Sequence, residues 1–384
     1  MGENNNKSGF VRLKDVCRIN MGQSPDSESY NEEGEGIPFF QGNSDFGDRY
    51  PTTRKWCSAP TKIAQPKDIL ISVRAPIGAM NYAKEECCIG RGLAALSPDT
   101  EKVSSEFIFW LLKGKHDELN SKGTGSTFKA ISRKILEDVQ VPDLSIDNQL
   151  EISRRLEKIY DLMQLRRDQL TKLDTLIKAR FVEQFGDVIR NNKNWKIYLF
   201  SEVAESRLGK MLDAKKQTGL YSYPYLANFN VQWFSFNLDN LNQMDFDDKE
   251  QKEFELQDGD ILVCEGGEIG RCAVWHNQLQ HCYFQKALHR VRCNRDVLQP
   301  DYLSWWFKFN CDHGGFSAIE GAKATIAHLP GAKLKRLEVA VPPIELQVQF
   351  SAFVAQVDKS KVAVQKSLDE LQTLFDSLMQ EYFG

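Results

Sequence analysis

The feature that most constrains the fold is a long internal repeat, in which residues 149–186 align without a gap on residues 347–384. Nine of the 38 aligned positions are identical, including the glutamine at the start of each copy and the Phe-Gly pair at its end. Neither copy contains an internal proline or glycine, and glycine is favoured just after a helix ends. The repeat therefore predicts two long helices of the same length.

The apolar residues of both predicted helices recur at alternating spacings of four and three, in the same register. Sustained spacing of this kind is typical of a coiled-coil seam. The alternative is two unrelated amphipathic helices that pack on their own domains, but the agreement of the two registers favours the coiled coil. The seam residues are Ile152, Leu156, Ile159, Met163, Leu170, Leu173 and Ile177 in the first helix and Phe350, Val354, Val357, Val364, Leu368, Leu371, Phe375 and Leu378 in the second.

Chain geometry predicts how the domains are arranged. A helix of about 39 residues is roughly 58 Å long, whereas the linker that follows it can stretch to about 28 Å at most. The next segment must therefore lie at the far end of the first helix, and the second helix must run back. We expect an α+β protein with two pseudo-repeated α/β domains separated by two long antiparallel helices, with approximate two-fold internal symmetry. The expected boundaries are 1–146 and 195–342 for the domains, 147–186 and 343–384 for the helices, and 187–194 for the linker.

Both predicted domains contain a similar phrase, "PKDILISVRAPIGAMNYA" at 66–83 and "DGDILVCEGGEIGRCAVW" at 258–275. Aspartate, isoleucine, leucine and glycine recur at equivalent places, so the phrase predicts the same strand–turn–strand scaffold twice. The copies differ in the turn, where Arg74 stands opposite Gly266. We expect the sequence-specific information to lie where the copies disagree.

Aromatic residues at helical spacing mark the segments 104–119 and 301–310. Such a pattern is typical of a core helix rather than of a ligand-binding site. Short strand-like runs at 68–73, 138–142, 260–265 and 289–293 alternate with loops rich in Gly, Ser and Asn.

Composition predicts a cytoplasmic protein that does not enter a membrane. No apolar run approaches the length of a transmembrane helix. The nine cysteines are an odd number and none are spaced as Cys-x-x-Cys. This usage indicates reduced thiols.

The net charge of −4 excludes a uniformly basic nucleic-acid binder. Three segments nevertheless carry Lys and Arg without any acidic residue, at 122–134, 281–295 and 321–336, while acidic residues gather at 239–260. A charge run is commonly just a solvated face. Each basic segment is therefore either a solvated face or a phosphate-binding surface.

Motifs that would indicate catalysis are missing. The segment "GTGSTFK" at 123–129 has the wrong spacing for a phosphate-binding loop. The Asn/Asp-Pro-Pro-aromatic element used by amino methyltransferases does not occur. Histidines and cysteines gather at 264–293, but their spacing does not fit a zinc site. We expect no catalytic residue and no metal site on this chain.

Two loop-rich domains with basic segments, spaced by rigid helices, suit a long and nearly two-fold symmetric partner such as duplex DNA. Lys, Arg, Ser and Thr contact phosphates, and Arg, Asn and Gln contact base edges. Half-sites on one face of DNA lie about one helical turn apart, a separation that the helices can set. One alternative is a coiled-coil adaptor whose domains bind proteins, and another is an enzyme with an unfamiliar active site.

The chain resembles the specificity (S) subunit of type I restriction–modification systems over nearly its whole length. The domain–helix–domain–helix order contributes to the resemblance. So do the segments "GQSPDSESYNEEGEGIPFFQG" (22–42), "PKDILISVRAPIG" (66–78), "IGRGLAAL" (89–96), "FVEQFGD" (181–187) and "VPPIELQVQF" (341–350). One departure is that Glu265 and Glu268 stand where the first domain has Val73 and Pro76. The loop after this strand need not contact DNA in the same way in both domains.

The resemblance implies two target recognition domains, each reading one half of a split, asymmetric DNA sequence. It implies that the helices are spacers whose outer faces dock two modification subunits. Those subunits would carry S-adenosylmethionine and methylate adenine at N6, and two restriction subunits that use ATP and Mg²⁺ can join them. The chain itself would be non-catalytic and would bind no cofactor.

Candidate site residues follow from residue type and loop position. The candidate DNA contacts are Gln41, Asn43, Ser44, Arg74, Arg91, Ser126, Thr127, Phe128, Lys129, Ser132, Asn228, Asn230, Lys286, Arg290, Lys323, Thr325 and His328. The candidate partner-binding residues form a stripe off the seam, Leu162, Leu165, Leu176 and Phe185. The alternatives are solvation for the cations and packing on the protein's own domains for the stripe. Replacing Lys129 or Lys323 by Ala is expected to weaken binding to all DNA sequences and to lower the salt slope by about one each.

Overall fold

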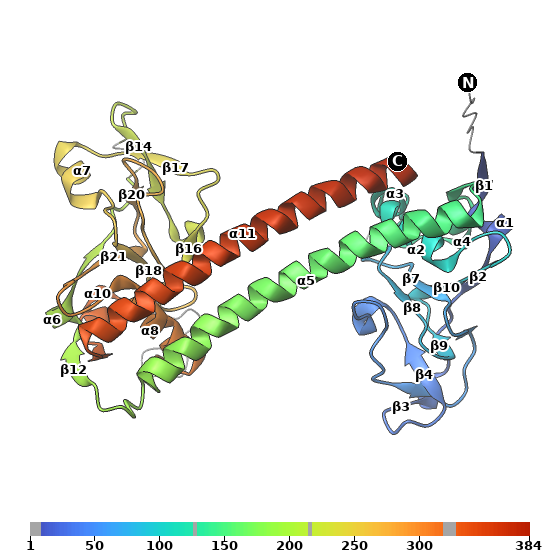
Figure 1. The fold of residues 1–384 in the computed structure, drawn as a ribbon, viewed down its shortest axis with the longest axis horizontal. Helices are drawn as coiled ribbons and strands as arrows, with labels where there is room; N and C mark the ends of the chain where they lie inside the picture. The colour runs from blue at the N-terminus through green and yellow to red at the C-terminus, as the bar shows by residue number, and fades with distance from the viewer. Residues whose placement is uncertain (1–8, 126–128, 214–216, 318–327) are drawn as a thin grey trace. The chain divides into compact units, whose positions relative to one another are not determined.

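The computed structural model describes residues 9–125, 129–213, 217–317 and 328–384. The chain forms two compact units, one of Met1–Arg167 with Lys366–Gly384 and the other of Asp168–Gln365. Each unit holds one α/β domain together with about half of each long helix (Figure 1). The units are called the first and the second unit below.

The first unit is built on two sheets. A four-stranded antiparallel sheet has the order β2-β10-β7-β8, and a five-stranded sheet has the order β3-β5-β4-β9-β6. The strands are β1 (Phe10–Arg12), β2 (Cys17–Met21), β3 (Tyr30–Asn31), β4 (Ile37–Phe40), β5 (Trp56–Cys57), β6 (Ile63–Ala64), β7 (Ile69–Ser72), β8 (Met80–Tyr82), β9 (Cys87–Ile89), β10 (Leu93–Pro98) and β11 (Gln140–Pro142). The helices are α1 (Leu13–Val16), α2 (Ser105–Gly114), α3 (His116–Ser121), α4 (Arg133–Glu137) and the first part of α5 (Ile146–Phe185), with a 3-10 turn η2 at Asn43–Asp45.

The second unit repeats this plan. Its four-stranded sheet has the order β13-β21-β18-β19, the equivalent of the first unit's sheet strand by strand. The strands are β12 (Lys196–Leu199), β13 (Ala204–Leu208), β14 (Ser222–Leu226), β15 (Val231–Gln232), β16 (Ser235–Phe236), β17 (Asn242–Asp245), β18 (Ile261–Cys264), β19 (Cys272–Val274), β20 (Tyr283–Phe284), β21 (Leu288–Cys293) and β22 (Glu338–Val341). The helices are α6 (Phe200–Val203), α7 (Asp248–Phe254), α8 (Pro300–Asp312), α10 (Gly331–Leu334) and the first part of α11 (Ile344–Phe383), with a 3-10 turn η4 at Asn228–Asn230. The predicted α+β class with a repeated domain and two long helices is confirmed.

The repeated phrase forms the same tight entry into a buried strand in both units. The Asp68 carboxylate accepts a hydrogen bond from the Gln65 amide at 2.9 Å, and Asp260 accepts one from Gln257 at 2.8 Å. All four residues of β7 and of β18 are buried. These aspartates therefore stabilise the turn before the strand, as expected of scaffold residues.

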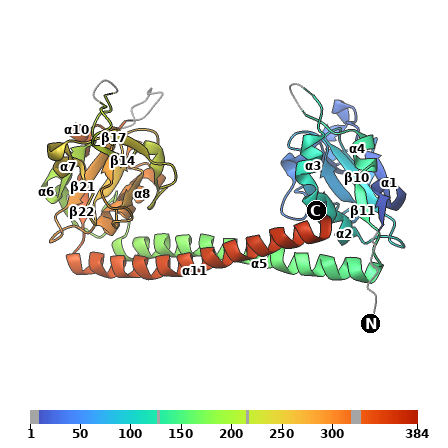
Figure 2. The ribbon, with the colours of Figure 1, turned by 90° about the horizontal axis from the view of Figure 1, so that it is seen from above.

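The aromatic helices lie in the core, as their spacing predicts, but the first is shorter than expected. Segment 104–119 divides into α2 and α3, because Gly114 ends α2 where α11 passes close by. A Cβ atom on Gly114 would lie 2.9 Å from the Met379 side chain. In each unit the α/β domain packs on one side of its helical portion (Figure 2).

The two long helices pair in antiparallel fashion within each unit. In the second unit the Phe181 and Phe350 rings lie 5.6 Å apart, and the Lys361 ammonium lies 2.6 Å from the Asp174 carboxylate. In the first unit Tyr160 faces Phe375, with their ring centroids 6.5 Å apart. In an antiparallel pair, the residue numbers of facing residues have a constant sum as long as the register does not shift. This sum is nearly the same for the pairs in both units, so each unit pairs the two helices in the same register. None of the predicted seam residues is exposed.

A buried glutamine fastens the start of each long helix to its domain. Gln149 is 2% exposed, and its Oε1 accepts a hydrogen bond from the Ser104 amide, which caps α2, at 2.9 Å. Its Nε2 donates to the carbonyls of Lys102 and Leu144, at 3.2 and 2.8 Å. The fully buried Gln347 makes the same three bonds, to Gln299, Val297 and Pro342, at 2.9, 3.0 and 2.7 Å.

We predict that Gln149→Leu lowers the free energy of unfolding by about 3 kcal/mol, because it leaves the buried Ser104 amide and two part-buried carbonyls without their partner. Urea denaturation followed by circular dichroism measures the change. The control is Gln140→Leu on an exposed strand residue, which should stay within about 0.5 kcal/mol of wild type. Equal loss in both variants would contradict the role given to Gln149.

Candidate nucleic-acid interface

In the first unit, backbone hydrogen bonds gather four loops at one edge of the sheets. The amide of Val73 donates to the Gly92 carbonyl at 2.9 Å, and that of Gly92 donates to the Gln41 carbonyl at 3.1 Å. The amide of Ile131 donates to the Val73 carbonyl at 2.9 Å. We name this set the first loop cluster, formed by residues 41–44, 73–76, 90–92 and 129–132. It brings together predicted residues that are up to 91 positions apart in the sequence.

Two glycines make the close approach of these loops possible. A Cβ atom on Gly90 would lie 2.5 Å from the Gln41 side-chain oxygen, and one on Gly92 would lie 2.5 Å from the Gln41 carbonyl oxygen. Arg91 stands between them and is exposed. The Gly-Arg-Gly sequence therefore holds a long cation at the surface of the first loop cluster.

The first loop cluster is basic. Arg74, Arg91 and Lys129 are exposed, and none of them forms an ion pair with any residue that the structure describes. Two other cations of segment 122–134 are less available, because Lys122 pairs with Glu118 at 2.6 Å and Arg133 with Glu137 at 2.7 Å.

The polar candidate residues of this unit differ in their exposure and in whether they already form hydrogen bonds within the protein. Ser44 and Ser132 are exposed, and the half-buried Asn43 begins η2. The Gln41 amide is already engaged, since its Nε2 donates to the Ser24 hydroxyl at 2.9 Å. Ser126, Thr127 and Phe128 lie outside the described residues.

The second unit has an equivalent set of loops. The amide of Glu265 donates to the Ala287 carbonyl at 3.0 Å, and that of Leu329 donates to the Glu265 carbonyl at 2.7 Å. The Asn228 side chain donates to the Gly266 carbonyl at 3.0 Å. We name residues 227–230, 265–268, 285–287 and 328–329 the second loop cluster. It brings the predicted residues Asn228, Lys286 and His328 together.

The second loop cluster carries less positive charge. Lys286 and His328 are exposed, and Lys286 pairs with no acidic residue among those described. Gly266 takes the place of Arg74. Below the cluster, burial lowers the pKa of His289, whose Nε2 lies 3.1 Å from the Leu329 carbonyl oxygen, so this imidazole stays neutral. Lys323 and Thr325 lie outside the described residues.

Asn230 is a correction to the predicted set of base-reading residues. It is 1% exposed, and both of its amide atoms are used inside the turn. Its Oδ1 accepts from the Ala227 amide at 2.9 Å, and its Nδ2 donates to the Asn237 carbonyl at 3.0 Å. Asn230 therefore braces η4 and does not face solvent. The exposed residue of this turn is Phe229, which is absent from the predicted contacts because the candidates in this turn, Asn228 and Asn230, are amide side chains chosen by residue type.

Arg290 is the second residue of the predicted DNA-binding set that the structure contradicts. Segment 281–295 is also less basic in the structure than its sequence suggests. Arg290 is 5% exposed and donates to the Glu253 carbonyl at 2.7 Å. Arg292 lies 2.6 Å from the buried Asp260 carboxylate. Part of the acid-free segment is thus paired in space with the acidic stretch 239–260, from which it is separated in sequence, while Lys286 stays exposed.

The predicted stripe on the long helices is exposed at three of its four positions. Leu162, Leu165 and Leu176 are 37%, 56% and 47% exposed. Phe185 is fully buried and packs against Tyr302 and Phe350, at ring distances of 4.8 and 5.3 Å, so its assignment to partner binding is wrong.

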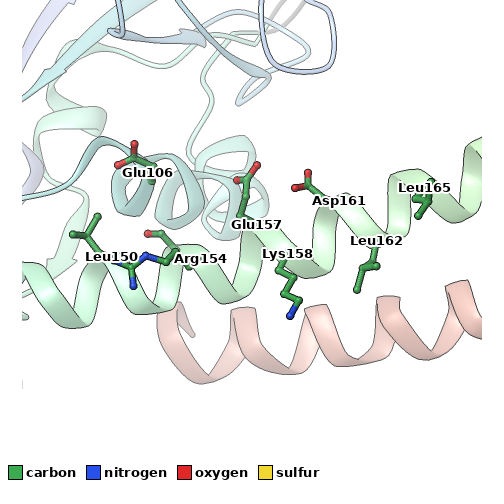
Figure 3. A pocket seen from close by; sticks show the side chains of 9 residues that line it. Glu106, Leu150, Arg154, Glu157, Lys158, Asp161, Leu162 and Leu165 are labelled. Atoms are coloured by element: carbon green, nitrogen blue, oxygen red, sulfur yellow. The ribbon is translucent and has the colours of Figure 1, made fainter.

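A groove of about 580 Å³ runs along α5 beside α2 in the first unit. Leu150, Leu162 and Leu165 line it, and charged side chains stand between them along the helix (Figure 3). An apolar floor with a charged rim is typical of a surface that another protein covers.

Two further observations concern the residues that the structure describes. They include no group of three or more His, Cys, Asp or Glu side chains placed to hold a metal ion. No helix among them combines the length and apolar character needed to cross a membrane.

A family model described as the type I restriction modification DNA specificity domain matches residues 5–175 and again residues 192–372. The chain is 43% identical over 157 residues to the putative type I restriction enzyme MjaX specificity subunit of Methanocaldococcus jannaschii, a match that covers 41% of this chain and 37% of that one. It is 26% identical over 187 residues to the MjaIX specificity subunit of the same organism, of which the match covers 43%. The chain thus spans less than half the length of these two relatives.

A third relative is matched over most of its length. The type I restriction enzyme EcoBI specificity subunit of Escherichia coli is 18% identical over 405 residues, which cover 97% of this chain and 85% of that one. Among solved structures, the type I restriction-modification system S subunit from M. genitalium has a TM-score of 0.62 at 14% identity, covering 100% of this chain and 98% of that one. At this identity the likeness concerns the fold alone.

The two matches of the family model cover nearly the whole chain and coincide with the two repeats seen in the sequence and in the fold. The chain belongs to the family of type I restriction–modification DNA specificity domains, and it contains that domain twice.

Proposed function

We propose that this chain is the non-catalytic specificity subunit of a type I restriction–modification complex and that it reads an asymmetric, bipartite sequence in duplex DNA. The observation that carries the proposal is the pair of loop clusters. The same backbone hydrogen bonds, Val73 to Gly92 and Glu265 to Ala287, hold both clusters together, while the side chains that they present differ. A shared framework with unlike side chains suits two related readers of two unlike half-sites.

The charge of the clusters agrees with this function. Exposed and unpaired cations bind phosphates, and the polar groups of neighbouring turns reach base edges. Asn228, Lys286 and His328 in the second loop cluster replace the more basic set of the first. We infer that contacts to phosphates contribute more to binding of the half-site read by the first unit than to binding of the half-site read by the second.

The chemistry would belong to partner subunits. In this proposal two modification subunits carry S-adenosylmethionine and methylate adenine at N6 within each half-site, and two restriction subunits that use ATP and Mg²⁺ can join them. The complex would act in the cytoplasm, and the nine free cysteines of the chain suit a reducing compartment.

Removing one cation from the first loop cluster should weaken binding to all DNA sequences. We predict that Arg91→Ala and Lys129→Ala each lower the slope of log K against log salt concentration by about one, because each releases one fewer counterion. The assay is fluorescence anisotropy of a labelled duplex with the chain and its modification subunits. Lys323→Ala, outside the described residues, remains a prediction from sequence.

The control for this titration is Lys172→Ala, an exposed α5 residue outside both loop clusters, which should keep the wild-type slope. Unchanged slopes in Arg91→Ala and Lys129→Ala would remove the first loop cluster from the interface. Failure of the wild-type complex to bind any duplex would refute the proposed function itself.

We propose that the groove beside α2 docks a modification subunit. Leu162 and Leu165 expose apolar surface that has no cover in the first unit, and Leu176 does the same in the second. Fully burying an exposed leucine contributes about 1.5 to 3 kcal/mol, so covering the exposed parts of Leu162 and Leu165 would add to the energy of a specific contact.

The double variant Leu162→Glu with Leu165→Glu is predicted to weaken assembly with the modification subunit by about a hundredfold, because two charges would enter an apolar contact. Sedimentation velocity of the mixed subunits measures assembly, and circular dichroism checks that the helices persist. Lys172→Glu on the same helix is the matched control and should assemble normally. Assembly of the double variant at the wild-type concentration would show that the groove is not the docking surface.

A further inference from the structure

The two loop clusters present chemically opposite side chains at equivalent positions of their 3-10 turns. Both turns begin with an asparagine, Asn43 in η2 and Asn228 in η4. The next residue is Ser44 in the first unit and Phe229 in the second, and both are exposed. Phe229 is 58% exposed, and none of the ring contacts among the described residues involves it.

A lone exposed phenylalanine would need no explanation, but this one is held by an elaborate support. On one side of it, the Asn228 Oδ1 accepts a hydrogen bond from Arg271 at 2.6 Å, and the Asn228 Nδ2 donates to Gly266 at 3.0 Å. On the other side, buried Asn230 fastens the turn to Ala227 and Asn237. Six residues thus take part in fixing the backbone on which Phe229 stands.

A second apolar side chain lies in the neighbouring loop. Met211 is 64% exposed and directly follows Lys210, whose carbonyl accepts a hydrogen bond from the Lys286 amide at 2.9 Å. At the equivalent place in the first unit, Ser24 follows Gln23, whose amide donates to the Ile89 carbonyl at 3.1 Å, just as the Lys210 amide donates to the Phe284 carbonyl at 3.2 Å. The half-buried Ser24 hydroxyl is bonded to the Gln41 side chain, whereas Met211 at the equivalent place of the second unit exposes an apolar side chain.

We propose that Phe229 is a specificity-determining residue that contacts the apolar surface of a base, such as a thymine methyl group, in the half-site read by the second unit. The proposal rests on the proposed function. Phosphates surround any groove that the cluster enters, and the exposed Lys286 of the same loop cluster can bind them. The thymine methyl is the apolar group that the major groove exposes, and phenylalanine is one of the side chains that contact it. Because the turn is already fixed before binding, little conformational entropy is lost when Phe229 makes this contact.

The experiment compares wild-type, Phe229→Ala and Ser44→Ala chains, each with the modification subunits. Wild type first selects its preferred duplex from a random-sequence pool, and affinities are then measured for every single base-pair change in both halves of that duplex. Phe229→Ala is expected to bind the selected duplex about tenfold more weakly, as the loss of a buried aromatic contact requires. It should also lose discrimination at one or two adjacent positions within one half.

Ser44→Ala should leave that discrimination intact, and Phe229→Leu should restore part of it, because leucine keeps an apolar contact. Thermal unfolding should be unchanged in Phe229→Ala, since the ring is exposed. Discrimination that is unchanged at every position, or lowered equally at all of them, would overturn the proposal while leaving DNA recognition in place. If wild type selects no sequence, it is the proposed function that fails.

Discussion

Two buried glutamines hold this architecture together. Gln149 and Gln347 each satisfy one amide and two carbonyls at the point where a long helix leaves its domain. A buried amide with three fitted bonds has one low-energy orientation, because any other leaves several polar groups unpaired. The direction of each helix relative to the domain it leaves is therefore fixed by hydrogen-bond geometry, and the apolar seam then has a defined register to follow.

Above this fixed base, the loops are free to vary. Most of the hydrogen bonds that assemble each loop cluster come from backbone groups, so they depend little on which side chains the loops carry. The exceptions are Gly90 and Gly92, which allow the close approach in the first cluster, and the Asn228 side chain in the second. This reliance on backbone groups explains how Arg74 and Gly266, or Arg91 and Lys286, can occupy equivalent places on one framework. A protein built in this way can change the sequence it reads without changing its fold, and it can read two different sequences with two copies of one domain.

The helices, the repeated domains and the main strands could be predicted from the sequence. Helical periodicity and strand-like alternation are local signals, and the repeat at an offset of 198 residues can be read directly from the sequence. The predicted helices at 147–186 and 343–384 agree with Ile146–Phe185 and Ile344–Phe383 to within one residue. What failed depended on contacts between distant segments. Asn230 looks like a base reader until its bond to Asn237 is seen, and Arg290 looks available until its burial and its bond to the Glu253 carbonyl are seen. The burial of Phe185 likewise follows from the second domain's core, which helix spacing alone does not reveal.

The most direct test of the account is to map methylated adenines in the source genome by sequencing, with and without a functional copy of this chain. The account predicts one motif that depends on the chain, split into two unlike halves by a fixed spacer, with one methylated adenine in each half. A motif that is continuous or palindromic, or a methylation pattern that persists when the chain is deleted, would contradict the central claim that two unlike reading surfaces on one framework direct recognition.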